Sequence, residues 1–386
     1  MTRSDHDSAL DPAGDRAFMA HALRLARRGL YTTDPNPRVG CVIVSGDEVV
    51  GEGWHERAGG SHAEVAALAD AGAAAQGATA YVTLEPCSHH GRTPPCADAL
   101  LKAGVARVVM ASHDPNPTVA GQGTARLAAA GVSVTSGILD TEAATLNVGY
   151  MRRMRSGRPY VRSKIAVSLD GRTALSNGVS QWITGAAARA DVQRLRARSS
   201  AILTGVGTVM ADDPSLNVRA TELGDVLQPL RVIVDSRLRT PVASRILTLA
   251  GETVVMTAST EPAARRLIED AGVRVEAVAV GADGRVDPDA VLSRLAELEI
   301  NEVLVEAGAR LNGALLQAGL IDELVIYIAG SILGANARGM FAMPELSEMS
   351  QRPEFDLADT RRVGQDLRLT WKNRPDQGKR DQGKRE

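Results

Sequence analysis

Aromatic side chains are scarce in this chain, at 3% of 386 residues, and neither sign of charge dominates, since 44 basic and 46 acidic side chains leave a net charge of −2. Few aromatic rings leave few platforms on which bases can stack, and a balanced charge provides no general attraction to a polyanion. The composition therefore argues against nucleic acid as a partner.

Cysteine is also rare, with three residues in all. A small odd number argues against a disulfide framework and favours a reducing compartment. No apolar run approaches the roughly 20 residues that a membrane-spanning helix needs, and the first residues lack the basic-then-apolar order of a signal peptide. We therefore expect a cytoplasmic protein with no membrane partner.

What the sequence does contain is a set of residues typical of a zinc site. His62-Ala63-Glu64 is followed by Pro86-Cys87 and then by Cys96. One imidazole and two thiolates leave the fourth position of tetrahedral zinc open for a water, whose pKa the metal lowers toward about 7. Glu64 is spaced to stay outside the coordination sphere and to carry a proton from that water to a leaving amine. The motif predicts a pyrimidine-deaminating site with His62, Cys87 and Cys96 as ligands and Glu64 as the catalytic residue.

Each of these residues also has an ordinary structural interpretation. A lone His beside an apolar helical run is more often a satisfied surface or core residue, and a lone Cys is usually buried packing. The conjunction favours metal, because two of the three cysteines fall in the short downstream segment that the motif requires. We interpret the third, Cys41, as a small core residue in the apolar run 39–44.

The length of the chain predicts two domains. In the first half, a helix over about 15–29 precedes short β-branched runs that alternate with helical segments, and His62 and Cys96 each open a helix. Expected strands here are 39–44, 80–84, 106–110 and 132–135, with helices at about 62–75, 94–103 and 122–130. Alternation of this kind predicts an α/β fold whose sheet is covered on both faces.

Near residue 150 several arginines interleave with Gly157 and Pro159, and we place the domain boundary there. A second set of strands is expected at 160–167, 201–205, 230–234, 253–257, 302–306 and 324–328, again with helices between them. This predicts another complete α/β domain. The repeated Asp-Gln-Gly-Lys-Arg at the end has no apolar residue to bury and is expected to be disordered.

The motifs of both halves resemble one family. Pro35–Gly40, His62–Glu64 and Glu85–Cys96 closely resemble the deaminase half of the bifunctional riboflavin-biosynthesis deaminase/reductases, and Lys164–Arg172, Ser180–Thr184 and Asp212–Leu216 resemble its reductase half. The resemblance covers about residues 15–372. It implies a cytidine-deaminase-like α/β/α sandwich at 15–150, a dihydrofolate-reductase-like α/β domain at 158–373, and a tail at 374–386.

One departure from the general zinc-deaminase pattern supports this family. The second cysteine comes nine positions after the first rather than three. The inserted loop contains His89, His90 and Arg92, which are candidates for substrate contact, although loop packing is an equal alternative for His89.

The resemblance also implies the chemistry. Zinc-dependent deamination of a diaminopyrimidinone ribosylamine 5′-phosphate would be followed by NADPH reduction of the ribosyl group to ribityl, through a ring-opened imine. The partners would be these small-molecule pyrimidine ribosylamine phosphates, and a homo-oligomer would be expected.

Residue by residue, the resemblance assigns two sets of contacts. Substrate positions are Asn36, Ser180, Arg196, Leu216, Arg219 and Glu306. Cofactor positions are Ala166, Trp182, Thr208, Asp212, Ser236 and the run Gly308, Ala309, Arg310, Leu311, Asn312 and Gly313. Two arginines suit a phosphate held bidentately, although Arg196 lies in an arginine-rich helical run where a solvated face is the ordinary interpretation. The glycine turn at 308–313 follows a strand and opens a helix, so its N–H groups are candidates for the pyrophosphate.

Several points stay open at the level of sequence. The acid that assists hydride transfer is Lys164, Asp212 or Glu306, and the residues do not rank them. Ser236 and Arg237 are hypothetical contacts to a 2′-phosphate. Two alternatives remain: a zinc deaminase whose second domain only binds or positions, and a non-catalytic scaffold with a structural zinc. A structural zinc normally has four protein ligands, and the sequence offers three.

Overall fold

The computed structural model describes residues 12–88, 95–117 and 119–374, so the loop residues His89, His90 and Arg92 and the expected disorder at the end lie outside the described residues. The chain divides into two compact units, Met1–Ser156 and Gly157–Glu386. None of the helices in the described ranges is both long enough and apolar enough to span a membrane.

The first unit is built on a five-stranded sheet in the order β2-β1-β3-β4-β5. Strands β3, β4 and β5 are parallel, and β1 is antiparallel to both β2 and β3. The elements are α1 (Pro12–Ala26), η1 (Arg27–Gly29), β1 (Gly40–Ser45), β2 (Glu48–Trp54), α2 (Ala63–Ala71), η2 (Gly72–Ala75), β3 (Thr79–Leu84), α3 (Cys96–Lys102), β4 (Arg107–Ser112), α4 (Gln122–Ala129), β5 (Ser133–Ser136), α5 (Asp140–Leu146) and α6 (Val148–Ser156).

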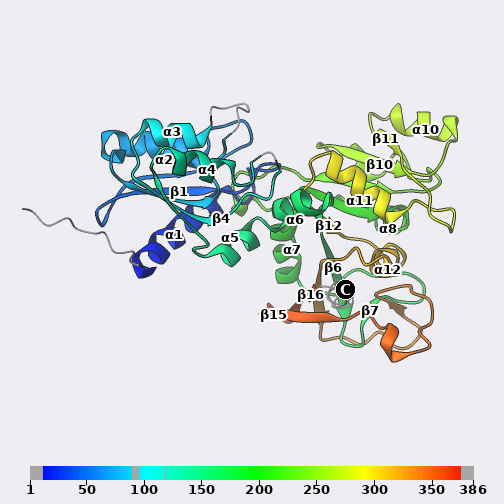
Figure 1. Ribbon diagram of the computed structural model, residues 1–386. Helices are drawn as coiled ribbons and strands as arrows, with labels where there is room; N and C mark the ends of the chain where they lie inside the picture. Colours follow the sequence, from blue (N-terminus) through cyan, green and yellow to red (C-terminus); the bar gives the residue numbers. More distant parts are fainter. Residues whose placement is uncertain (1–11, 89–94, 118, 375–386) are drawn as a thin grey trace, which may run out of the picture. The chain divides into compact units, whose positions relative to one another are not determined.

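Helices cover both faces of this sheet (Figure 1). Strand β1 shows why: Cys41 and Ile43 point into the core under α2 and α3, whereas Val42 and Val44 point into the core under α1. Successive side chains of a strand face opposite sides, so an unbroken apolar run is what a sheet buried on both faces requires. Cys41 is fully buried there, in agreement with its interpretation as a core residue.

Close backbone contact sets the position of helix α2. A Cβ atom at Gly53 of β2 would lie 2.4 Å from the backbone oxygen of Ala63, and one at Gly51 would lie 2.3 Å from that of Ala67. Only glycine permits this approach. The first turn of α2, which carries Glu64, is therefore held against the sheet.

The second unit contains a nine-stranded sheet in the order β11-β10-β9-β8-β12-β6-β13-β16-β15. The seven strands from β11 to β13 run parallel, and β16 is antiparallel to both β13 and β15. The strands are β6 (Tyr160–Ser168), β7 (Arg172–Ala174), β8 (Ala201–Gly205), β9 (Leu230–Val234), β10 (Thr253–Thr257), β11 (Arg274–Ala277), β12 (Glu302–Val305), β13 (Glu323–Ala329), β14 (Arg338–Gly339), β15 (Phe355–Val363) and β16 (Asp366–Asn373).

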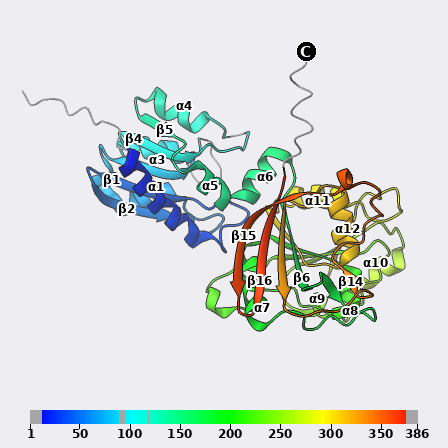
Figure 2. The same cartoon turned by 90° about the horizontal axis from the view of Figure 1, so that it is seen from below.

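Two helical layers enclose this sheet as well. Helices α11 and α12 pack on one core, and α7, α8, α9 and α10 pack on the other. The helices are α7 (Ala186–Arg198), α8 (Val206–Asp212), η3 (Thr221–Leu223), α9 (Arg245–Thr248), α10 (Pro262–Glu269), α11 (Pro288–Glu297), α12 (Ala309–Gln317) and η4 (Met349–Gln351). Strands β15 and β16 form a long hairpin at one edge (Figure 2).

All ten strands expected from the sequence are present within a few residues, and α2 and α3 begin where expected. The first helix starts at Pro12 rather than at about residue 15, and its last turn is a 3-10 helix. The arginine-rich segment near residue 150 is the helix α6, which packs Tyr150 and Met151 against Leu84. The division between the two units follows this helix.

Candidate active sites

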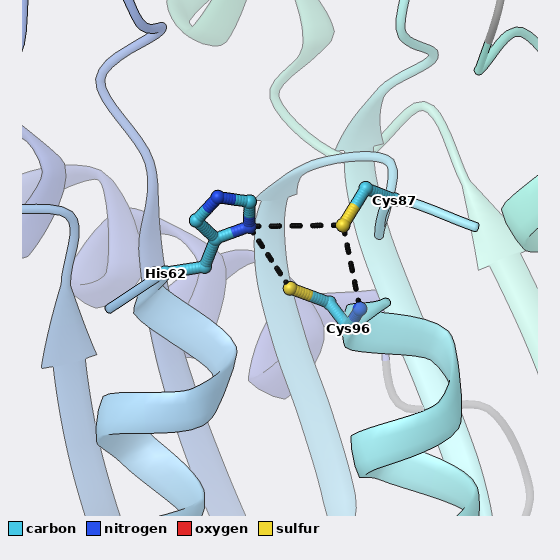
Figure 3. A group of neighbouring side chains, drawn as sticks. All are labelled: His62, Cys87 and Cys96. Atoms are coloured by element: carbon cyan, nitrogen blue, oxygen red, sulfur yellow. Dashed lines mark hydrogen bonds between the residues drawn. The ribbon is translucent and has the colours of Figure 1, made fainter. Parts of the chain in front are cut away.

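The three ligands predicted for zinc converge in the first unit. Nδ1 of His62 lies 3.1 Å from Sγ of Cys96 and 3.7 Å from Sγ of Cys87, and the three ligand atoms lie within 4.8 Å of one another. Figure 3 shows the imidazole and both sulfurs pointing toward a common centre. His62 is the N-cap of α2, Cys96 opens α3, and Cys87 comes from the loop after β3.

These separations fit a zinc ion. Zn–S bonds of about 2.3 Å and Zn–N bonds of about 2.0–2.1 Å at tetrahedral angles imply nitrogen-to-sulfur separations of about 3.6 Å. Within the described residues these three side chains are the group of His, Cys, Asp and Glu residues that could hold a metal ion. The donor set is the one that leaves a coordination position open.

Proton sharing between the two sulfurs agrees with a ligand role. A hydrogen bond from Cys96, against the opposing effect of burial, lowers the pKa of Cys87 to about 4. The same hydrogen bond and burial raise the pKa of Cys96. The lowered pKa of Cys87 favours its thiolate form, and the backbone N–H of Cys96 donates to its sulfur across 3.3 Å.

Glu64 lies directly beside this group. Its side chain is 3% exposed and hydrogen-bonds to Cys96. Burial raises its pKa to about 6, although the charge on His62 opposes the rise. A carboxyl group with a pKa near neutrality can both accept and release a proton, which is the property that a proton shuttle needs.

A second buried carboxylate, Glu85, holds the loop after β3 that carries Cys87, which is called the cysteine loop below. It directly precedes Pro86-Cys87 and accepts hydrogen bonds from the backbone N–H groups of Gly121 and Thr124 and from the Thr124 hydroxyl, each at 3.1 Å. Gly123 makes the approach possible, because a Cβ there would lie 1.9 Å from the oxygen of Pro86. The N-terminus of α4 is thereby fixed to the backbone that presents Cys87.

Asn36, predicted to contact the pyrimidine, is oriented by His55. The backbone oxygen of Ser61 lies 2.9 Å from His55 Nδ1, which must donate to it, so Nε2 accepts from Asn36 Nδ2 at 3.0 Å. This contact uses the amide nitrogen of Asn36 and fixes the orientation of its side chain. Burial lowers the pKa of His55, so the imidazole stays neutral. The sequence interpretation missed His55, since a single histidine after a glycine-containing strand carries no distinctive spacing.

In the second unit, the predicted residues gather where parallel strands end. Thr208, Ser236 and Glu306 follow the carboxyl ends of β8, β9 and β12, which are neighbours in the sheet with β6 beside β12. Ligands of open α/β sheets bind at the carboxyl ends of the strands, which are called the carboxyl-end edge below. Gly308, the N-cap of α12, donates its backbone N–H to the Thr208 hydroxyl across 3.2 Å, which joins two predicted cofactor positions.

Three charged side chains form a group at the carboxyl-end edge of the sheet. Arg196 donates to both carboxylate oxygens of Glu306, and Lys164 Nζ lies 3.8 Å from Glu306 Oε2. Burial alone would raise the pKa of Glu306, but the two cations outweigh it and hold that pKa below its ordinary value. Burial, assisted by Arg196, lowers the pKa of Lys164.

The other predicted substrate residues differ in their exposure. Arg219 is exposed, and its pKa is lowered by burial of part of its guanidinium and by the nearby charges of Arg196 and Arg245. Arg245 belongs to no motif that the sequence interpretation used, although it follows Ser236 by only nine residues. Leu216 is buried, and the half-buried Ser180 donates to Asp212 across 3.3 Å.

The predicted cofactor positions divide into surface and interior. Trp182 is 71% exposed, and Ala166 is half-buried on β6. Ser236 accepts a hydrogen bond from the backbone of Val286. In the run from 308 to 313, Gly308 and Arg310 are exposed and Ala309 and Leu311 are half-buried, whereas Asn312 and Gly313 lie in the interior. The Asn312 amide is occupied by Ser163 and by the oxygen of Ala307.

Comparison with known proteins agrees with both sites. Residues 12–112 match the family model "Cytidine and deoxycytidylate deaminase zinc-binding region", and residues 159–369 match "RibD C-terminal domain". The chain is 51% identical over 365 residues to the riboflavin biosynthesis protein RibD of Escherichia coli, covering 92% of this chain and 98% of that protein. It is 47% identical over 368 residues to the RibD of Haemophilus influenzae, covering 92% and 97%.

Solved structures give the same result. One form of Acinetobacter baumannii RibD superposes with a TM-score of 0.87 at 48% identity, covering 95% of this chain and all of that one. A Thermotoga maritima protein, described as a diaminohydroxyphosphoribosylaminopyrimidine deaminase/5-amino-6-(5-phosphoribosylamino)uracil reductase, superposes with a TM-score of 0.83 at 31% identity, covering 95% and 100%.

Fold, ligand geometry and matches together define a two-domain enzyme in which a zinc-dependent deaminase of the cytidine-deaminase type is joined to an NADPH-dependent reductase. The chain belongs to the RibD family, the bifunctional deaminases and reductases of riboflavin biosynthesis. The expected fold, cofactors and pairing of activities are confirmed, and both alternatives, a second domain without catalysis and a zinc scaffold, are excluded.

Proposed function

We propose that this enzyme deaminates 2,5-diamino-6-(5-phosphoribosylamino)pyrimidin-4(3H)-one and then reduces 5-amino-6-(5-phosphoribosylamino)uracil to its ribityl form. The observation that carries the proposal is the convergence of His62, Cys87 and Cys96 on one point with the buried carboxyl of Glu64 beside them. The similarity to the Thermotoga maritima protein supports the substrates.

In the first step, water adds to the amine-bearing ring carbon, ammonia leaves and a carbonyl remains. Zinc, when bound to His62, Cys87 and Cys96, supplies the Lewis acidity that makes a water nucleophilic at neutral pH. Glu64 accepts a proton from the water and delivers it to the amine nitrogen as the carbon–nitrogen bond breaks. Asn36 holds the pyrimidine through its amide oxygen, in the orientation that His55 sets.

Replacing Glu64 with Gln tests the deaminase assignment. We expect ammonia release to fall by at least about a hundredfold, which is the lower range for loss of general acid–base catalysis. Zinc content should remain at one per chain, and NADPH oxidation on the deaminated substrate should be unchanged, because the reductase residues lie in the other unit. Deamination at the parental rate would show that Glu64 does not carry the proton.

In the second step, NADPH supplies the hydride that C1′ of the ribosyl group receives after its ring opens. We propose that Lys164 protonates the ring oxygen as the ring opens. Its half-buried ammonium lies 3.8 Å from Glu306, whereas Asp212 is exposed and accepts a hydrogen bond from Ser180. Glu306 is held ionised by its two cations and has no proton to donate.

The remaining reductase roles follow from position along the carboxyl-end edge. We assign the exposed Arg219 to the substrate phosphate, with Arg196 and Glu306 orienting the ribosyl group from the buried side. Ser180 and Leu216 would complete the substrate site. Trp182, Thr208, Ser236, Ala166, Asp212 and the surface part of the run from Gly308 are assigned to the cofactor.

Replacing Lys164 with Met tests the acid. We expect the reductase kcat to fall by about a hundredfold or more, with ammonia release unchanged. The matched variant Asp212→Asn should lower kcat far less. If Asp212→Asn abolishes reduction and Lys164→Met does not, the roles are reversed.

A homo-oligomer and a cytoplasmic location stay predictions. What supports self-association is an apolar hollow of about 360 Å³ on the second unit, whose lining includes the exposed Leu169. Its lining includes Leu324, Ile326, Ile328, Leu369 and Trp371. An exposed apolar surface of this kind is typical of an interface. Light scattering of the purified chain tests this, and a monomeric mass would contradict it.

A further inference from the structure

We infer that Arg189, on helix α7, is a positioning residue for NADPH, because it holds the loop that carries Ser180 and Trp182. The inference rests on the proposed role of Trp182 in cofactor binding. Arg189 belongs to no motif that the sequence interpretation used.

Two contacts made by one guanidinium define the role. The guanidinium carbon of Arg189 lies 4.6 Å from the centroid of the Trp182 ring, a cation–π distance, and its Nη1 donates to the backbone oxygen of Thr184 across 2.7 Å. Arginine is suited to this because its planar group can stack and donate at the same time. Arg189 therefore fixes both the ring and the backbone two residues after it.

The same loop is fixed at its two ends by carboxylates. Ser180 donates to Asp212 at the start, and the backbone N–H of Gly185 donates to Asp366 across 2.7 Å at the end. Between these two ends, the loop residues Trp182 and Thr184 are held by Arg189. Without them the exposed Trp182 ring would be free to rotate into solvent.

Helix α7 is itself anchored to the sheet, so Arg189 acts from a rigid base. Asp191 follows Arg189 by two residues on the same helix. Its carboxylate accepts hydrogen bonds from the hydroxyl of Tyr327 on β13 at 2.6 Å and from Arg368 on β16 at 2.9 Å. Tyr327 is fully buried. A side chain on such a helix can hold a loop in one orientation at little further entropic cost.

The two contacts of Arg189, to Trp182 and to Thr184, are called the clamp here. The exposed area of Trp182 indicates that this clamp serves ligand binding and not only the stability of the loop. The ring is 71% exposed although it is a large apolar group, and one side of it is stacked by Arg189. An indole held in place presents its remaining surface to a flat ligand ring. Pre-ordering that surface lowers the free-energy cost of binding, which appears as cofactor affinity.

The experiment measures the Kd of NADPH for the full-length enzyme by cofactor fluorescence. Arg189→Met, which keeps the stem and removes both contacts, should raise Kd by roughly 5- to 30-fold, the equivalent of a cation–π contact plus a hydrogen bond. At saturating NADPH kcat should stay within about twofold, and ammonia release should not change. Arg189→Lys, which retains a cation and donor, should restore part of the affinity.

The control is Arg194→Met, an exposed arginine of the same helix whose described ion pair is with Asp191 at 4.0 Å. It should leave Kd unchanged. An unchanged Kd in Arg189→Met, or an equal change in Arg194→Met, would overturn the inference.

A double-mutant cycle with Trp182→Ala tests whether Arg189 acts through the ring. The double variant should bind NADPH no more weakly than Trp182→Ala alone, and fully additive losses would contradict the clamp. If Trp182→Ala weakens binding and Arg189→Met does not, this inference fails and the role of Trp182 stands. If Trp182→Ala leaves Kd unchanged, the proposed role of Trp182 fails.

Discussion

Arg196 and Glu306 are joined by two parallel hydrogen bonds, with Nε 2.6 Å from Oε1 and Nη2 3.0 Å from Oε2. The third nitrogen of Arg196, Nη1, donates to the backbone oxygen of Asn217, so each of the three is engaged. Arg196 is 9% exposed. The ordinary interpretation of an arginine in an arginine-rich helix, a solvated face, is therefore wrong for this residue. Its guanidinium lies inside the second unit, where it holds the pKa of Glu306 below its ordinary value.

Replacing Glu306 with Gln should both destabilise the second unit and abolish reduction. The change removes the carboxylate and leaves the buried Arg196 beside the half-buried Lys164 with no opposite charge between them, and breaking a buried pair in this way costs about 3 kcal/mol. Urea unfolding followed by circular dichroism would measure the loss. The double variant Arg196→Met/Glu306→Gln should recover most of the stability and none of the activity. If the single variant is as stable as the parent, the pair contributes nothing to folding.

Removing the metal should separate the two activities. Chelation of the purified enzyme should abolish ammonia release, because the three ligands lie in the first unit. Oxidation of NADPH on the deaminated substrate should continue at its original rate, and added zinc should restore ammonia release. Parallel loss of both activities would show that the metal supports the structure of the whole chain.

Much of this architecture could be predicted from local pattern, and what was missed has a physical reason. Strand β2 was not expected because its sequence contains Gly51 and Gly53, which weaken a strand signal. In the structure, the backbone of helix α2 lies so close to these two glycines that a side chain at either position would clash with it. The hairpin of β15 and β16 was missed because it lies at an edge and buries few side chains. An exposed edge strand does not need the apolar run by which a buried strand is recognised.

The zinc ligands could be predicted because metal chemistry restricts both residue type and number. His55, Glu85 and Arg189 could not, since they act by hydrogen bonds or stacking with partners that only the fold brings near: Asn36 is 19 residues from His55, and Thr124 is 39 from Glu85. Arg189 lies close to Trp182 in sequence, but an arginine on a helix is ordinarily solvated. Residues that orient others carry little pattern of their own.

The reductase should lose activity at alkaline pH because Lys164 must be protonated to act as the acid. Burial, assisted by Arg196 and opposed by Glu306, lowers the pKa of Lys164 below the ordinary 10.5. The kcat for reduction should therefore fall as the pH rises through that lowered pKa, at a lower pH than for a free lysine. A profile that is flat up to pH 10.5, with the enzyme still folded, would contradict this role.

Glu85 should control how tightly the first unit retains zinc, although it touches no ligand atom of the predicted site. In Glu85→Gln one of the two acceptor oxygens becomes a donor that faces the N–H of either Gly121 or Thr124, so the backbone that presents Cys87 should loosen. Loss of such supporting contacts typically costs about 10- to 100-fold in metal affinity. Competition with a chromogenic chelator would measure it, and Glu142→Gln, at an exposed position on α5 of the same unit, is the matched control. Equal zinc affinity in the Glu85 variant and the control would show that the cysteine loop holds its shape without this carboxylate; weaker binding, with deaminase activity recovering in excess zinc, would show that Glu85 acts on the metal site by holding its backbone.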